Sequence, residues 1–192
     1  MTASHLIWYV DRGAGFTALV LLSVSMLLGL LLGMGVAGRW WPRYVTAEVH
    51  RFATLVALVF VAIHGTAVLL DPYTGFSFRD VTVPFASAYH PVAMAAGIVG
   101  AYLVAAVWLS VKVRRRIGYR MWRSLHRLAF AGFALGVLHT VLIGTDAGTA
   151  WGVAVTGVCV AAVAGLTAYR VLRSRPAAPR FSADSEVPQG MS

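Results

Sequence analysis

Four histidines form two widely spaced pairs in apolar segments of the sequence. His50 and His64 bound the segment HRFATLVALVFVAIH, and His126 and His139 bound the segment HRLAFAGFALGVLH. An imidazole inside a hydrocarbon-length helix is costly to bury without a partner, so such a histidine indicates a functional site. Neutral imidazole is a good axial ligand for haem iron, and two imidazoles from facing helices fill both axial positions. The sequence therefore predicts two haems per chain.

Iron held by two histidines has no open position for oxygen or substrate, which favours electron transfer over catalysis at the metal. A single non-haem metal ion is unfavourable, because ligands about 20 Å apart along a helix cannot share an ion whose bonds are near 2 Å. The alternative reading is that the histidines snorkel, bond to a neighbouring helix or relay protons. The chain would then be a non-redox transporter or membrane anchor.

The spacing of each pair sets a condition on its helix. At about 100° per residue, His50 and His64 return to within about 40° of each other and share one face of a straight helix. His126 and His139 are separated by one residue fewer, which leaves them roughly 140° apart. Their helix must therefore bend, wind unevenly or cross its partner at an angle. Gly132 and Gly136 lie between these ligands, so we expect that distortion and a close approach of the macrocycle there.

Composition places the histidines in a membrane protein. The 192 residues are 59% hydrophobic, with a mean hydropathy of +0.75, far above a soluble domain. The predicted fold class is all-α, an integral membrane five-helix bundle binding two stacked b-type haems. We expect an extracytoplasmic segment over 1–13, a transmembrane domain over 14–172 and a disordered cytoplasmic tail over 173–192. Five apolar runs can each cross a core of about 30 Å: 14–37, 50–70, 91–111, 124–144 and 150–172.

The distribution of charge predicts the orientation of the chain. The net charge of +9 does not indicate nucleic acid binding, because the basic residues flank apolar runs rather than lining a polar face. Fourteen of the 16 Lys and Arg residues fall on one side, which the positive-inside rule assigns to the cytoplasm. We therefore expect a multi-pass protein in contact with membrane lipid, with its N-terminus outside and its C-terminus in the cytoplasm.

Both histidine-bearing helices then run from the cytoplasmic face to the outer face. His50 and His126 form an inner pair, and His64 and His139 form an outer pair about 20 Å further along. Two redox sites at these depths would form a relay across the bilayer.

The connection 71–90 is long and aromatic. Aromatic side chains favour the membrane interface, so this loop is either a lid across the outer site or an ordinary interfacial loop. Its aromatic residues are Tyr73, Phe76, Phe78, Phe85 and Tyr89.

The histidine pattern resembles the ferric reductase-like transmembrane domain, which is shared by NADPH oxidases, ferric-chelate reductases and the haem subunit of the bacterial methionine sulfoxide reductase system. The segments WYVDRGAG, VPFASAYHP and LIGTD are similar to short bacterial members. The resemblance covers about residues 6–172. It implies a protein of the bacterial cytoplasmic membrane in which His50 lies opposite His126 and His64 opposite His139.

The resemblance also implies roles for three arginines. Arg12 matches a family arginine that lies near the outer haem, where it can pair with a propionate or help to hold an anionic acceptor. Arg51 and Arg127 follow the inner ligands and can meet the inner propionates. The alternative is that these three arginines serve only to orient and anchor the chain in the membrane.

Two further residues lie on the outer side. His90 is a candidate for the outer acceptor site, as a donor, a proton source or a metal-chelate contact; the alternative is an interfacial histidine with no special role. Asp146 provides a carboxylate that can orient His139 or a bound water.

Larger family members carry a flavin and nicotinamide dehydrogenase after the last helix. Here about twenty polar residues follow, without a Gly-rich phosphate loop. We therefore expect a separate cytoplasmic flavoprotein reductase, or another reduced donor, to supply electrons. The basic connection KVRRRIGYRMWR can dock an acidic flavoprotein or bind flavin directly, although topology already accounts for most of its charge.

These observations together predict a di-haem b-type membrane cytochrome, the electron-transfer component of a transmembrane oxidoreductase. Its extracytoplasmic acceptor would be a ferric chelate, oxygen, a quinone or a redox protein. The alternative within the same chemistry is a haem subunit dedicated to a partner enzyme, such as a periplasmic methionine sulfoxide reductase.

Overall fold

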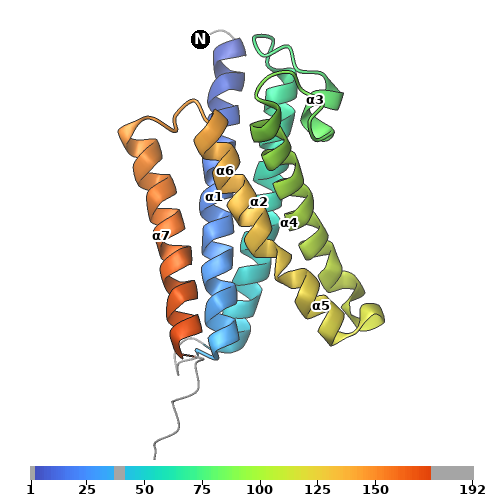
Figure 1. Cartoon of the computed structure of the whole chain (residues 1–192), viewed down its shortest axis with the longest axis vertical. Helices are drawn as coiled ribbons and strands as arrows, with labels where there is room; N and C mark the ends of the chain where they lie inside the picture. Colours follow the sequence, from blue (N-terminus) through green and yellow to red (C-terminus); the bar gives the residue numbers. More distant parts are fainter. Residues whose placement is uncertain (1–2, 37–41, 174–192) are drawn as a thin grey trace, which may run out of the picture.

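The computed structural model of the chain describes residues 3–36 and 42–173, which are helical with loops between the helices and contain no strand. Five of its helical segments are long and apolar enough to cross a membrane, as predicted. The chain is therefore an all-helical, multi-pass membrane protein (Figure 1). In chain order the helices are α1 (Ala3–Met34), α2 (Arg43–Leu70), α3 (Phe78–Thr82), α4 (Pro91–Ile117), α5 (Tyr119–His126), α6 (Leu128–Ile143) and α7 (Ala150–Arg173).

Four of the five spans extend beyond their predicted apolar runs. α2 begins at Arg43 rather than at 50, and the fourth span begins with α5 at Tyr119 rather than at 124. α1 begins at Ala3, so most of the predicted segment 1–13 belongs to the helix, because its apolar residues continue along α2. α4 continues to Ile117, since Lys and Arg are good helix formers and cations favour a helix C-terminus. Gly118 ends α4 with a φ of 78°. The predicted tail from 174 onward and part of the first connection, 37–41, lie outside the described residues.

The bundle consists of two helix pairs and one flanking helix. α1 packs along α2, and α4 packs along α6, while α2 and α4 meet only in part. α7 lies against α1, on the side away from α4 (Figure 1). A small apolar core joins α1, α6 and α7 and consists of Leu19, Phe133, Cys159 and Val163. The histidines of α2 meet one histidine of α5 and one of α6.

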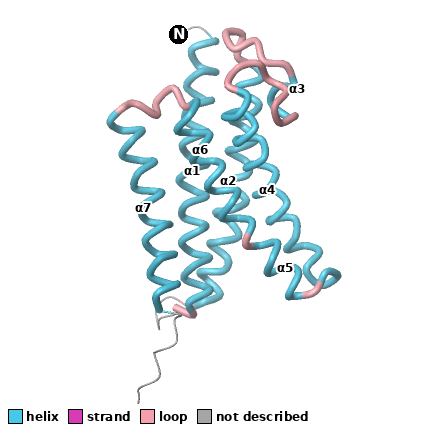
Figure 2. The backbone as a smooth tube through the Cα atoms, viewed as in Figure 1, coloured by secondary structure: helices cyan, strands magenta, loops and turns pink. Residues whose placement is uncertain are grey.

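The fourth predicted span is broken. α5 ends at His126 and α6 begins at Leu128, with Arg127 between them at φ −67° and ψ −20°. Figure 2 shows this break as a short loop between two helices of different direction. The predicted distortion is confirmed, but its expected position was wrong, because α6 is continuous through Gly132 and Gly136.

Gly132 serves close packing of helices instead. A Cβ at Gly132 would lie 2.9 Å from Val104 Cγ2 and 3.3 Å from the Gly100 carbonyl oxygen of α4. Small residues at such contacts let two membrane helices approach each other closely. A glycine within a helix therefore marked a helix–helix contact here rather than a bend.

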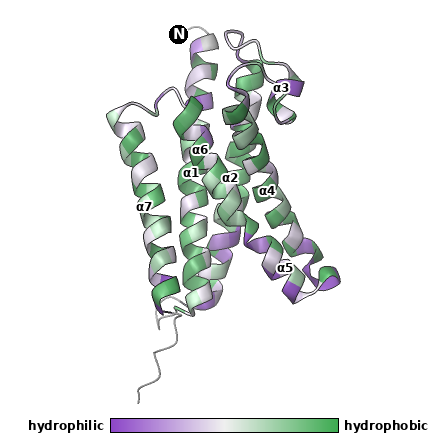
Figure 3. Cartoon of the chain, in the orientation of Figure 1, coloured by the Kyte–Doolittle hydropathy of each residue, from purple (hydrophilic) through white to green (hydrophobic). Residues whose placement is uncertain are grey.

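Polar side chains gather at the two ends of the bundle. Figure 3 shows hydrophilic residues at the start of α2, the end of α4 and along α5, and again around α3 and the start of α1. The stretches between these ends are apolar. This distribution is that of a protein whose middle faces hydrocarbon.

Candidate functional site

The four histidines meet as two pairs. His50 of α2 faces His126 of α5, and His64 of α2 faces His139 of α6. The ring centroids are 6.1 Å apart in both pairs, with interplanar angles of 67° and 79°. His64 lies near the end of α2 that leads to α3, and His126 is the last residue of α5, so the outer pair is toward the α3 end of the bundle and the inner pair toward the α5 end. Figure 1 shows α3 and α5 at opposite ends.

The ring separation fits two axial ligands of one metal ion. Imidazoles bound on opposite sides of an ion through bonds of about 2 Å place their centroids roughly 6 Å apart. A T-shaped pair of aromatic rings in direct contact has a similar separation. The hydrogen bonds on the far side of three of the four rings favour the metal-ligand explanation.

Three of the histidines point Nδ1 at a main-chain carbonyl. The Nδ1 of His50 lies 2.9 Å from the Ser25 oxygen, that of His64 lies 3.1 Å from the Asp11 oxygen, and that of His139 lies 2.8 Å from the Ala93 oxygen. A carbonyl only accepts, so Nδ1 donates and Nε2 keeps its lone pair. This tautomer, held by a backbone acceptor, is the one that metal-binding histidines use.

His126 is the exception. Its Nδ1 is buried and has no hydrogen-bond partner among the described residues. The ring lies instead against Trp122, with centroids 5.1 Å apart and an interplanar angle of 33°. The Arg114 guanidinium lies 5.2 Å from the centroid of that indole. His126 is thus oriented by ring packing rather than by an acceptor.

Three histidine rings lie against a glycine of the neighbouring helix. A Cβ at Gly97 would lie only 2.6 Å from the Nδ1 of His139, so no larger residue fits without moving that ring. Each glycine lies four residues after the residue whose carbonyl accepts the Nδ1 hydrogen bond, and the two share one helix face. The glycines are Gly15 for His64, Gly29 for His50 and Gly97 for His139.

The α1 contacts repeat with the period of the α2 histidines. Asp11 and Gly15 contact His64, and Ser25 and Gly29 contact His50. The separation between these two pairs along α1 equals the separation between the two histidines along α2. The repeat is visible in the sequence and was the signal by which these supporting residues could have been found. The histidine spacing alone did not reveal them.

Each pair offers two protein ligands. Within the part of the chain that the structure describes, no three His, Cys, Asp or Glu side chains group as a metal-ion site. Structural zinc sites need four such ligands, whereas haem iron needs two axial ones. The donor sets therefore fit haem.

Arg12 forms an ion pair with Asp146 of the α6–α7 connection, using both Nε and Nη2. Its guanidinium also lies 3.8 Å from the centroid of the Trp8 ring. The Asp146 side chain is only 4% exposed, and Thr149 fixes its position by donating to the Asp146 carbonyl. The contact of Arg12 with a propionate or an anionic acceptor is still a prediction.

One of the two roles predicted for Asp146, the orientation of His139, was wrong, and the other, the orientation of a bound water, is still a prediction. The Nδ1 of His139 is bonded to the Ala93 carbonyl, because the turn after α6 directs Asp146 toward α1. The carboxylate that does reach a histidine is Asp11, whose Oδ1 lies 2.7 Å from the Nδ1 of His64.

The two inner arginines lie beside their histidines in sequence but make local contacts. Arg51 pairs with Glu48 on the exposed face of α2. Arg127 donates to the Ser124 hydroxyl at 3.1 Å from the break between α5 and α6. Their contact with propionates is still a prediction.

His90 is exposed immediately before α4, with a φ of 41°. Its ring forms an edge contact with Tyr89, the centroids 4.6 Å apart. Its described ring contact is to this neighbour and not to either histidine pair, so its role at an acceptor site is also still a prediction.

The outer loop is built around α3. Ser77 and Asp80 form a capping box at the start of this helix, and the Ser77 hydroxyl and amide lower the pKa of the Asp80 carboxyl. Tyr73, Phe78 and Phe85 are 77%, 70% and 67% exposed. Side chains that project outward favour the interfacial loop over the lid.

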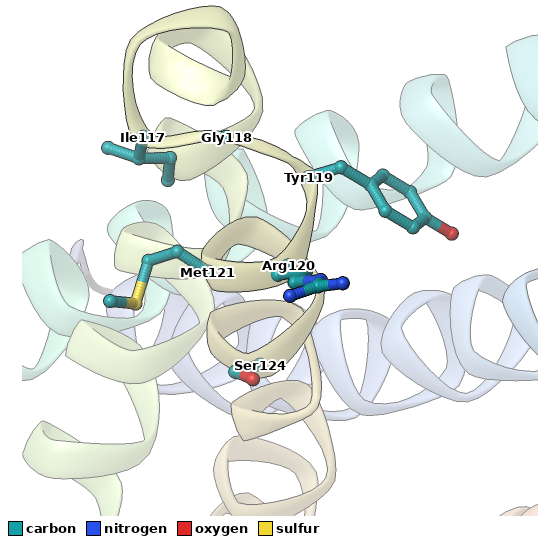
Figure 4. Close-up of a pocket in the computed structure, with 6 residues that line it drawn as sticks. All are labelled: Ile117, Gly118, Tyr119, Arg120, Met121 and Ser124. Carbon is teal, nitrogen blue, oxygen red and sulfur yellow. The ribbon is translucent and has the colours of Figure 1, made fainter.

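A surface hollow lies at the opposite end, at the connection between α4 and α5. Figure 4 shows that Tyr119 and Met121 extend to opposite sides of this turn. The hollow includes none of the four histidines. Its lining residues are Ile117, Gly118, Tyr119, Arg120, Met121 and Ser124.

Comparison with known families supports the resemblance seen in the sequence. Residues 14–137 match the family described as Ferric reductase like transmembrane component. The matched range contains His50, His64 and His126 and ends just before His139. Searches of curated proteins and of solved structures gave no match. Because the matched range is well over half of the sequence, the chain belongs to the ferric reductase-like transmembrane family.

Proposed function

We propose that this chain is a di-haem b-type cytochrome that carries electrons across a membrane. Electrons from a cytoplasmic reduced donor would pass through an inner and then an outer haem to an extracytoplasmic acceptor. The observation that carries this proposal is the meeting of four histidines as two pairs with one ring separation, 6.1 Å. Bound haem supplies a one-electron couple that changes state with little rearrangement of its ligands.

The residues of the chain would hold and space the two cofactors. His50 and His126 are the ligands proposed for the inner haem, and His64 and His139 those for the outer haem. The two ligands on α2 are about 21 Å apart along the helix axis, because that helix is unbroken from Arg43 to Leu70.

The donor is proposed to be an acidic flavoprotein that docks at the α4–α5 end. Among the described residues, the cations between 112 and 123 form no ion pair with an acidic side chain, so their charge is available to a partner. Flavin would come with that partner or bind at the same face. Electrostatic docking predicts that reduction slows as ionic strength rises.

An absorption spectrum of the purified protein tests the cofactor. Expressed with adequate haem, the protein should show the dithionite-reduced bands of b-type haem. His64→Ala or His139→Ala should lose only the outer haem, and His50→Ala or His126→Ala only the inner one. A wild-type protein without these bands would contradict the proposal and favour a non-redox transporter or anchor.

Reconstitution in liposomes tests the direction of transfer. With reductant trapped inside and a candidate acceptor outside, the acceptor should be reduced while the vesicles are intact. The acceptors to compare are a ferric chelate, oxygen, a quinone and a periplasmic redox protein. Reduction that begins only when the vesicles are broken would argue against transfer through the protein.

A further inference from the structure

The two histidine pairs differ in what their Nδ1 atoms contact. In the outer pair, the Nδ1 of His64 lies 3.1 Å from the Asp11 carbonyl oxygen and 2.7 Å from its Oδ1. The N–H of His64 is hydrogen-bonded to the Asp11 carbonyl, and the carboxylate of the same residue lies beside the ring as an ion-pair contact without a hydrogen bond of its own among the described residues. In the inner pair, the Nδ1 of His50 lies 2.9 Å from the Ser25 carbonyl oxygen and 3.0 Å from its hydroxyl. The Nδ1 of His126 has no partner among the described residues.

The charge on Asp11 is not taken up by its basic neighbour. Arg12 follows it in sequence, but its guanidinium is held by Asp146 and by the Trp8 ring. Among the described residues, the ion-pair contact of the Asp11 carboxylate is with His64. Gly15, one turn further along α1, leaves room for the ring to approach: a Cβ there would lie 3.2 Å from the Nδ1 of His64.

A carboxylate behind a metal-bound imidazole changes the metal's preference for oxidation state. Its negative charge stabilises positive charge on the imidazole and on the metal behind it, and so makes Nε2 the stronger donor. A stronger axial donor stabilises ferric iron over ferrous iron, because the oxidised ion carries the larger positive charge. Asp11 would therefore make the outer haem harder to reduce.

The inner end of the bundle carries the opposite charge. Arg127 follows the inner ligand His126 directly, and Arg114 lies over Trp122, which stacks on His126. The charge of Arg51, beside His50, is balanced by Glu48. Cations near a haem favour the state with the additional electron. The two ends of the chain thus bias their sites in opposite directions.

We propose that Asp11 is the positioning residue of the outer site, which fixes His64 by its Nδ1 and sets the outer haem at a more negative reduction potential than the inner haem. This inference rests on the proposed function, because it requires both haems to be bound. It assigns the difference between the sites to this chain's own residues rather than to the cofactors, which are the same at both positions.

Potentiometric titration of the purified, haem-loaded protein tests the inference. In Asp11→Asn, which removes the charge but keeps a side-chain oxygen, the more negative of the two titration steps should move to a more positive potential. We expect roughly a tenfold shift of that reduction equilibrium, or about 59 mV for a one-electron couple. The other step should not move. The matched control is Asp80→Asn, which removes a charge from the outer loop and should leave both steps unchanged.

Variants that keep one haem assign the steps. His126→Ala retains the outer haem and should titrate at the more negative potential, whereas His139→Ala retains the inner haem and should titrate at the more positive one. Low-temperature EPR of the ferric outer haem should also change in Asp11→Asn, because the donor strength of His64 changes.

Three results would overturn the inference: no shift in Asp11→Asn, an equal shift of both steps, or an outer haem that titrates above the inner one. If Asp11→Asn loses its outer haem during purification, the order of potentials in the single-haem variants decides the question. In each of these cases a wild type with both haems leaves the proposed function intact. A wild type without haem contradicts the proposed function itself.

Discussion

Behind the His139 ring there is space for a glycine and for nothing larger. In Gly97→Ala the new Cβ would lie 2.6 Å from Nδ1 and 2.8 Å from Cε1 of His139, so the ring must move and its bond to the Ala93 carbonyl is lost. We expect this variant to lose the outer haem and keep the inner one. Haem content and the reduced spectrum measure the effect.

Gly157→Ala is the matched control for that substitution. Gly157 also lies within a membrane helix, but a Cβ there meets no atom within 4 Å. This variant should retain both haems. If Gly97→Ala retains both as well, the packing of the ring against α4 does not hold it in place.

The ion pair between Arg12 and Asp146 leads to a prediction about stability. Asp146→Asn leaves the guanidinium without its counter-charge in a mostly buried place, and loss of one partner of a buried pair costs about 3–5 kcal/mol. Thermal unfolding in detergent should show a clear drop in the unfolding temperature. Arg12→Met should lower it too.

The double variant of this pair gives the control. Asp146→Asn combined with Arg12→Met should lose less stability than the sum of the two single losses, because the double variant leaves no charge unpaired, whereas each single variant does. Additive losses would mean that the two side chains do not interact energetically.

The residue types at the site were predictable, but their supports were not. The four histidines are unusual in apolar runs, and their spacing and direction predicted which would meet. The atoms that hold their Nδ1 groups are main-chain carbonyls of Asp11, Ser25 and Ala93. Every residue has a carbonyl, so only the packed helices show which ones face a ring.

At the scale of elements, the break at Arg127 decides how the fourth span presents its ligands. His126 ends α5 and His139 lies in α6, so the phase between them is set by the break and not by one continuous helix. One alanine inserted after Leu135 would restore the spacing found on α2 but rotate His139 by about 100° relative to the break. We expect loss of the outer haem, measured by haem content.

A second insertion provides the comparison. One alanine after Gly148, in the connection to α7, lies beyond both ligands and should leave both haems bound. If the insertion within α6 were tolerated equally well, spacing along the chain would matter more than the break.

The position of this break could not be read from the sequence. The spacing of His126 and His139 required a departure from a straight helix, and that requirement was met. The glycines offered an apparent place for it, yet Gly132 is needed for contact with α4. Whether a glycine bends its helix or allows close packing depends on which helix lies beside it. The tertiary fold decides which helix that is.

At the scale of the whole molecule, the distribution of cations predicts topology. Most of the Lys and Arg side chains among the described residues lie at the end of the bundle that carries α5. The positive-inside rule places that end in the cytoplasm. A green fluorescent reporter at the C-terminus should therefore fluoresce, and alkaline phosphatase inserted at Gly75 should be active. Activity of a phosphatase fused to the C-terminus would reverse the orientation and the names of the two pairs.

The unbroken course of α2 has an electrical consequence. Its two histidines are separated by about 21 Å along the axis, which is roughly two-thirds of a hydrocarbon core of about 30 Å. An electron that moved outward between them would cross most of the membrane's voltage drop. With the cytoplasm negative, the field would assist that step by roughly 1.5 kcal/mol for each 100 mV. An energised membrane would thus work against the bias that Asp11 imposes, and the rate of the chain would depend on voltage.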